Sequence, residues 1–379
     1  MQLSHEDTLR LKVLLANAEA VRIDDHAMCV FGLSAGREAK VPLNPNCRPE
    51  SYLRMVREML STHVLGSPKG YPVYLRRWTR MGQMQSARLD PLLMLGEPEA
   101  VTAVACSPSL TDELAERVWW ALPDPEIARY MLERDAVVRG KMGRVLAEYL
   151  AEYLPFEQDA HTLIRSVRLV LQPGLLSDEQ VGQIWGRGAR KNAYYVGFLQ
   201  ARPDALPERK PPRSDWDYQR ARLAPLIRAG NVFAAQLAWL LSGPGQTYLQ
   251  TSVAVLRKPV DQDVVVSLLE ALRQYFAPVM PFEVLPGDVE EIVRNADALT
   301  RSGSLPDGTP LPPLRELIHA FPDLQPDIAA MMVLTQVGEP VVRPIFSRTT
   351  AVGSLMRTKL EPVARPLLER FAVLLGIAG

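Results

Sequence analysis

The chain has 379 residues, and its 43 lysine and arginine residues balance 43 aspartate and glutamate residues, so the formal net charge is zero. Apolar residues make up 47% of the sequence, and at roughly 100 to 200 residues per domain we expect two or three domains. This composition excludes a disordered or fibrous chain, and the balanced charge excludes a protein whose whole surface binds nucleic acid.

Residues 1–85 combine helical and strand patterns. Apolar residues in Glu6 to Asn17 recur at helical spacing, and Ser4 is the expected N-cap. A second helix is predicted over residues 49–64. Between these helices, short runs rich in β-branched and aromatic residues are separated by turn residues, which predicts an antiparallel meander. The predicted strands cover residues 20–23, 27–33 and 37–43. We therefore expect a small α+β unit at the N-terminus.

Residues 86–208 are predicted to form a helical repeat region. Leu110-Thr-Asp-Glu leads to Trp119 nine residues later, and Leu176-Ser-Asp-Glu leads to Trp185 at the same interval. The Thr or Ser of each copy is a suitable N-cap, and each Trp is expected to face a neighbouring helix. Asp261 heads a third copy that lacks the Trp. The pattern favours HEAT-like stacked helical pairs, and the alternative is chance similarity between capped helices.

The clearest linker contains four prolines, at positions 203, 207, 211 and 212. Proline fixes φ and removes backbone donors, so this segment is expected to be extended and exposed. Residues 209–379 then form the third predicted domain, which is helical. Its main predicted helices cover residues 214–228, 232–241, 264–276, 289–300 and 362–375. The predicted fold is therefore mainly α.

The most unusual segment is basic and aromatic. No acidic residue occurs between Glu58 and Asp90, whereas arginines and aromatic residues alternate from Tyr71 to Arg88. Such a pattern suits a protein interface, and it also suits RNA, because guanidinium groups bind phosphate and bases stack on aromatic rings. The third interpretation is that the rings pack in the core and the arginines are solvated. The candidate contact residues are Arg76, Arg77, Trp78 and Arg80.

A second basic patch follows Trp185, and its candidate contact residues are Arg190, Lys191 and Tyr194. Backbone N–H groups at the start of a helix, together with the two cations, would suit an anion. The simpler alternative is a turn between two helices, with Tyr194 and Phe198 in the core.

The sequence offers few candidates for catalysis. The histidines are isolated and no CxxC is present, so we expect no metal site and no cofactor. Cys29 and Cys106 are expected to be buried thiols, whereas Cys47 stands beside Arg48 in a proline-rich turn and is the candidate reactive thiol. No secretory signal or membrane span is recognised, so we expect a soluble, cytoplasmic protein that does not bind membranes.

Two segments carry a resemblance to a known family. They are Val64-Leu-Gly-Ser-Pro-Lys-Gly-Tyr-Pro-Val-Tyr-Leu-Arg-Arg-Trp-Thr-Arg-Met-Gly-Gln83 and Arg190-Lys-Asn-Ala-Tyr-Tyr-Val-Gly-Phe-Leu199. Both are similar to the DsrS family, whose members are encoded with the reverse-acting dissimilatory sulfite reductase of sulfur-oxidising bacteria. The likeness extends over most of the chain. It implies an accessory or regulatory protein connected with the oxidation of stored sulfur, and it supplies no catalytic residues.

The expected function is therefore non-enzymatic. We expect contacts with proteins of the sulfur-oxidation pathway, made by the two basic patches. The alternative is post-transcriptional regulation through RNA bound by the same patches, whose affinity would fall steeply with rising salt.

Overall fold

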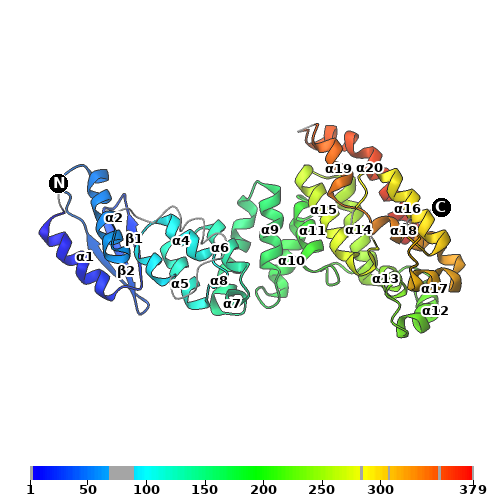
Figure 1. Ribbon diagram of the computed structural model, residues 1–379, viewed down its shortest axis with the longest axis horizontal. Helices are drawn as coiled ribbons and strands as arrows, with labels where there is room; N and C mark the ends of the chain where they lie inside the picture. The colour runs from blue at the N-terminus through cyan, green and yellow to red at the C-terminus, as the bar shows by residue number, and fades with distance from the viewer. Residues whose placement is uncertain (1–2, 68–88, 282–284, 306–307, 349–350, 378–379) are drawn as a thin grey trace. The chain divides into compact units, whose positions relative to one another are not determined.

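A computed structural model describes residues 3–67, 89–281, 285–305, 308–348 and 351–377 (Figure 1). The chain forms two compact units. The first comprises residues 1–153 and 172–176, and the second comprises residues 154–171 and 177–379. The fold is mainly α with a small α+β region at the N-terminus, as the sequence predicts. The predicted three-domain division stays a prediction, and the second unit contains both sides of the boundary after residue 208.

The predicted meander is present as one antiparallel sheet in the order β1-β2-β3. Its strands are β1 (Ala20–Asp24), β2 (Cys29–Ser34) and β3 (Arg37–Pro42). Ala35 and Gly36 form the two-residue turn between β2 and β3, and their φ angles are 48° and 73°. Positive φ at both positions is the geometry of a type I′ hairpin, whose twist matches that of the strands.

Two helices complete the N-terminal core. They are α1 (His5–Asn17) and α2 (Pro49–Leu65), and the Ser4 hydroxyl caps α1 by accepting from the Asp7 N–H, as expected. Leu14 of α1, Val30 of β2 and Tyr52 of α2 belong to one buried cluster. The other helices in the described part of the first unit are η2 (Asp90–Met94), α4 (Pro98–Ala105), α5 (Asp112–Ala121), α6 (Pro125–Leu132), α7 (Asp135–Val138) and α8 (Lys141–Tyr153).

The N-terminus of α8 is capped by a residue from another helix. The Asp112 carboxylate accepts hydrogen bonds from the backbone N–H groups of Lys141 at 2.8 Å and Met142 at 3.0 Å. The first N–H groups of a helix lack partners within the helix, so this carboxylate satisfies two of them and also complements the helix dipole.

Replacing Asp112 with alanine should therefore lower the free energy of unfolding by about 0.5–2 kcal/mol, the usual cost of losing a helix cap. Thermal and urea unfolding would measure the loss. Asp135→Ala is the matched control, because Asp135 is exposed and pairs with Arg139 on the surface, where such pairs contribute about 0–1 kcal/mol. Equal losses in both variants would contradict the capping role.

The described part of the second unit consists mainly of helices, and neighbouring helices pack side by side. Contacts join α9 to α11, α11 to α15, α13 to α14, α14 to α15 and α18 to both α16 and α20. Its helices are η3 (Leu154–Phe156), α9 (Ala160–Val170), α10 (Asp178–Arg187), α11 (Ala193–Ala201), α12 (Trp216–Arg228), α13 (Val232–Leu241), α14 (Gly243–Arg257), α15 (Gln262–Tyr275), η4 (Ala277–Val279), α16 (Val289–Ser302), α17 (Pro312–Ala320), η5 (Pro322–Leu324), α18 (Gln325–Leu334), α19 (Glu339–Phe346) and α20 (Gly353–Leu374).

The capped helices that repeat in the sequence are present. Thr111 caps α5, Ser177 caps α10 and Asp261 caps α15, each by accepting the N–H three residues later. Trp119 packs edge-on against Tyr149 of α8 with ring centroids 4.8 Å apart, and the Trp185 ring lies 4.6 Å from that of Tyr195 in α11. The caps and the orientation of both tryptophans toward a neighbouring helix are therefore confirmed.

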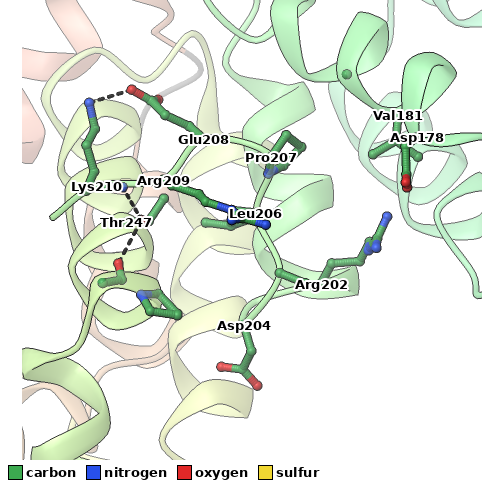
Figure 2. Close-up of a pocket in the computed structure, with 14 residues that line it drawn as sticks. Asp178, Val181, Arg202, Asp204, Leu206, Pro207, Glu208, Arg209, Lys210 and Thr247 are labelled. Atoms are coloured by element: carbon green, nitrogen blue, oxygen red, sulfur yellow. Dashed lines mark hydrogen bonds and ion pairs between the residues drawn. The ribbon is translucent and has the colours of Figure 1, made fainter. Parts of the chain in front are cut away.

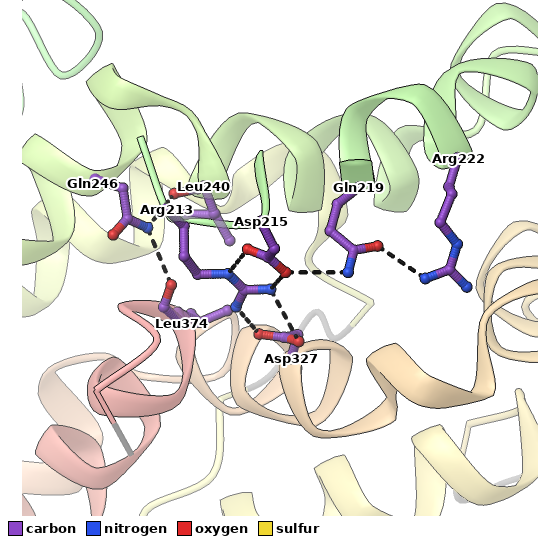
Figure 3. Close-up of polar contacts among 8 residues, drawn as sticks. All are labelled: Arg213, Asp215, Gln219, Arg222, Leu240, Gln246, Asp327 and Leu374. Atoms are coloured by element: carbon purple, nitrogen blue, oxygen red, sulfur yellow. Dashed lines mark hydrogen bonds and ion pairs between the residues drawn. The ribbon is translucent and has the colours of Figure 1, made fainter. Parts of the chain in front are cut away.

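A buried ion cluster connects two parts of the second unit, and a neighbouring buried amide connects two more (Figure 3). Arg213 donates two hydrogen bonds to the Asp215 carboxylate, at 2.7 and 2.8 Å, and also pairs with Asp327 of α18. Close by, the Gln246 amide donates to the carbonyls of Leu240 and Leu374, at 2.9 and 3.1 Å. These bonds tie the start of α12 to α18, and α14 to the end of α20.

No helix among the described residues is long and apolar enough to cross a membrane.

Candidate functional site

A cleft of about 810 Å³ opens in the second unit beside the irregular segment that follows α11 (Figure 2). One wall is the first two turns of α10, the second is residues 202–210, and the third is the start of α14. This volume lies in the range of small-molecule sites, about 300–1,000 Å³. The lining residues are Asp178, Val181, Gly182, Arg202, Asp204, Ala205, Leu206, Pro207, Glu208, Arg209, Lys210, Gly243, Pro244 and Thr247.

Several charged side chains of the cleft are already paired. Lys210 forms an ion pair with Glu208, and its backbone N–H donates to the Thr247 hydroxyl at 3.0 Å. Asp204 accepts a hydrogen bond from the Trp239 indole at 2.8 Å. By contrast, the guanidinium groups of Arg202 and Arg209 make no hydrogen bond or ion pair with any residue that the structure describes. Two strong hydrogen-bond donors therefore face the cleft without partners.

Two stacked tyrosines lie in the core near Asp204. The rings of Tyr248 and Tyr275 are 3.8 Å apart and nearly parallel, and both hydroxyls are buried without a hydrogen-bond partner among the described residues. Burial raises the pKa of both phenols, and the negative charge of Asp204 raises them further. Both phenols are therefore harder to ionise than a solvated tyrosine.

The start of α14 is shaped by glycine. A Cβ atom at Gly243 would lie 2.9 Å from the carbonyl oxygen of Lys210, so glycine lets the 202–210 segment pass close to the helix. The first turn of α14 contains no acidic residue, and the positive end of its dipole is therefore not neutralised within the helix.

The second basic patch is mostly structural. Tyr194 is 4% exposed and Phe198 is fully buried, which confirms the simpler interpretation of a turn with both rings in the core. Burial raises the pKa of the Tyr194 phenol. The Lys191 ammonium donates to the carbonyls of Glu157 and Gln158, at 2.8 and 3.3 Å. Of the three candidate residues, only Arg190 is exposed on the surface.

The first basic patch, with Arg76, Arg77, Trp78 and Arg80, lies outside the described residues. Its proposed role therefore stays a prediction.

The candidate thiol is less accessible than the sequence suggests. Cys47 is half-buried and packs against the N-terminal core, and its Sγ lies 3.7 Å from the Arg48 carbonyl oxygen. Cys29 is buried in β2 as expected, whereas Cys106 is half-buried. The described residues hold no cluster of three or more histidine, cysteine or acidic side chains that suits a metal ion.

Sequence reasoning identified the proline-rich segment as a linker and missed that it lines a cleft. The available signal was the presence of Arg202, Arg209 and Lys210 within nine residues of a segment that prolines keep out of a helix. The facing walls, α10 and the start of α14, come from other parts of the sequence and carry no matching motif.

No protein-family model, no curated protein and no solved structure matches this chain.

Proposed function

We propose that this chain is a non-enzymatic, cytoplasmic accessory or regulatory protein that acts through contacts with other proteins. The connection with oxidation of stored sulfur rests on the resemblance to the DsrS family alone. The contact role is supported by an apolar groove in the first unit, which carries the proposal.

The groove runs between α1 and the β2–β3 side of the sheet and has a volume of about 600 Å³. Leu9 and Val13 of α1 line it and are 65% and 60% exposed. Ala39 and Val41 of β3 line the opposite side. Exposed apolar side chains that gather in one groove are typical of a protein contact, because burying them against a partner removes apolar area from water.

The charges at the groove favour a partner with an acidic residue beside its apolar side chains. Arg10 and Lys40 line the groove, and none of its lining residues is acidic. Arg10 pairs with Glu6 one turn earlier in α1. The Lys40 ammonium lies 5.6 Å from the centre of the Phe31 ring and has no ion pair among the described residues, so Lys40 is the cation able to pair with an acidic group of a partner. A rim charge of this kind raises the rate of association and adds specificity.

RNA binding has less support from the described residues. A single-stranded RNA site needs exposed rings beside the cations, whereas Tyr194 is buried and the Lys191 ammonium is bound to two carbonyls. RNA binding is therefore the alternative that the RNase treatment in the following experiment detects.

The test is affinity capture of the tagged chain from a lysate of its native host, with and without RNase. We expect the wild type to capture proteins of sulfur oxidation, and we expect this capture to persist after RNase treatment. The variant Leu9→Ser/Val13→Ser should lose them, because it removes the apolar side chains of the groove. Lys12→Ser/Ala16→Ser is the matched control, since both residues are exposed on α1 and do not line the groove.

Three results would count against the proposal. Capture that disappears with RNase would favour RNA binding. Capture that is equal in the groove variant and the wild type would exclude the groove as the contact surface. A parallel variant, Arg76→Ala/Arg77→Ala/Arg80→Ala, tests the first basic patch, and loss of capture there alone would move the contact to that patch.

A further inference from the structure

The cleft of the second unit has unpaired donors on one side. Arg202 is half-buried at the end of α11, and Arg209 is exposed on the segment that follows. Figure 2 shows both side chains drawn at the cleft, with Arg202 extended toward the α10 wall. A guanidinium group offers five N–H donors in a planar fork, and its best partner is a phosphate or carboxylate group.

The acidic residues of the cleft do not supply that partner. Glu208 is held by Lys210, and Asp204 is held by the Trp239 indole. Asp178 lies on the opposite wall, and it forms no ion pair with either arginine. A guanidinium group that faces a cleft without a protein partner keeps its N–H donors available. An anionic ligand can therefore bind both arginines without displacing a protein carboxylate.

From the cleft and its two unpaired arginines, we propose that this site binds a small molecule carrying a doubly charged oxyanion group, a phosphate ester or a polycarboxylate. Arg202 and Arg209 bind the oxyanion, and the start of α14 adds its positive dipole end. Asp178 on the facing wall accepts hydrogen bonds from hydroxyl or amine groups of the ligand. This site is separate from the groove of the first unit, so the proposal does not depend on the proposed protein contact.

The experiment is isothermal titration of the full chain with pyrophosphate and, separately, with citrate, at physiological salt. We expect at least one of them to bind at millimolar concentrations, and the better ligand indicates whether phosphate or carboxylate is preferred. Arg202→Ala/Arg209→Ala should weaken binding by about tenfold or more, because it removes two charge-assisted interactions. Arg220→Ala/Arg228→Ala removes the same charge from exposed positions that do not line the cleft, and it should bind like the wild type.

A steric pair of variants tests the cleft without altering any charge. Gly182 lines the cleft and Gly186 does not, although both are exposed glycines of α10 with open space around an added Cβ. Both leucine variants should fold, because leucine is a better helix former than glycine. Gly182→Leu should block binding and Gly186→Leu should leave it unchanged. Absence of binding by the wild type, or equal weakening in the paired variants, would overturn the proposal.

Discussion

Arg213→Met should lower the stability of the second unit by about 3–5 kcal/mol, the usual cost of breaking a buried ion pair by removing one partner. Asp327 is 8% exposed and loses its cation in this variant, while Asp215 loses two hydrogen bonds. Methionine fills similar space and carries no charge, so the loss reports mainly on the uncompensated carboxylates. Urea unfolding followed by circular dichroism would measure it.

The matched control is Arg222→Met. Arg222 also pairs with an aspartate, Asp323 of η5, through two hydrogen bonds of 2.6 and 2.7 Å. That carboxylate is 53% exposed, so water replaces the lost partner and loss of this ion pair should cost about 0–1 kcal/mol. Arg222 also donates to the Gln219 amide oxygen at 3.0 Å, but this acceptor is neutral and its loss leaves no charge uncompensated. Similar losses in the two variants would show that the burial of Asp327 does not govern the stability of this cluster.

The stability deficit of Arg213→Met relative to the wild type should depend on pH. Burial raises the pKa of Asp327 above its ordinary value of 3.8, although its bonds with Arg213 act in the opposite direction. A carboxyl group with a raised pKa binds its proton more tightly in the folded state, so folding becomes more favourable as the pH falls through that pKa. Without Arg213 the pKa of Asp327 rises further. The deficit of Arg213→Met should therefore shrink on acidification from neutral pH toward 3.8.

In the wild type, the pKa of Asp215 is shifted in the opposite direction from that of Asp327. The hydrogen bonds from Arg213 lower the pKa of Asp215 below 3.8. Its contribution to stability is therefore present above pH 3.8 and is lost as the pH falls through the lowered value. The loss of the Asp215 contribution in the wild type should therefore occur below pH 3.8, whereas the variant regains stability above pH 3.8. A deficit that stays constant with pH would contradict both assignments.

Gly245→Ala should lower the stability of the second unit by about 3 kcal/mol, which is similar to the loss expected for Arg213→Met. This value is at the upper end of what overpacking usually costs. An added Cβ would lie 2.1 Å from the carbonyl oxygen of Trp239 and 2.6 Å from the Cα of Leu240. Both are backbone atoms at the end of α13, so neither can move away without separating α13 from α14. The expected result is a lower melting temperature with both helices less protected from hydrogen exchange.

The control for this prediction is Gly186→Ala in α10, where an added Cβ meets no atom within 4 Å. Alanine there should raise stability by about 0.5–1 kcal/mol, because glycine is a poor helix former. If both alanine variants were stabilised, the tight approach of α13 and α14 at Gly245 would be refuted.

Features that depend on nearby residues could be predicted from the sequence. Ser177 bonds to an N–H only three residues away, and the Ala35-Gly36 turn is set by two consecutive φ angles. Such interactions form within one turn of the chain, so the residue types and their spacing are sufficient to recognise them. The mainly α fold and the small sheet were predicted on this basis.

Helix bounds were less predictable where packing outweighs local preference. The sequence predicts the last helix from Pro362, a residue that favours the first turn, whereas α20 starts at Gly353 and contains Pro362 and Pro366 in its interior. Met356 and Leu360 extend the buried stripe of this helix before the first proline. Burial of those side chains against neighbouring helices compensates for the backbone hydrogen bonds that the prolines remove.

The sequence by itself therefore determined the mainly α fold, the N-caps made by nearby residues, the Ala35-Gly36 turn and the small sheet. Only the tertiary structure decided which charges are neutralised and which remain available. Arg213 meets Asp327 across 114 residues, whereas Arg202 and Arg209 stand in a cleft without a partner among the described residues. Paired and unpaired arginines look alike in the sequence. The packing of distant helices, and not the neighbouring residues in the chain, determines whether an arginine has an ion-pair partner.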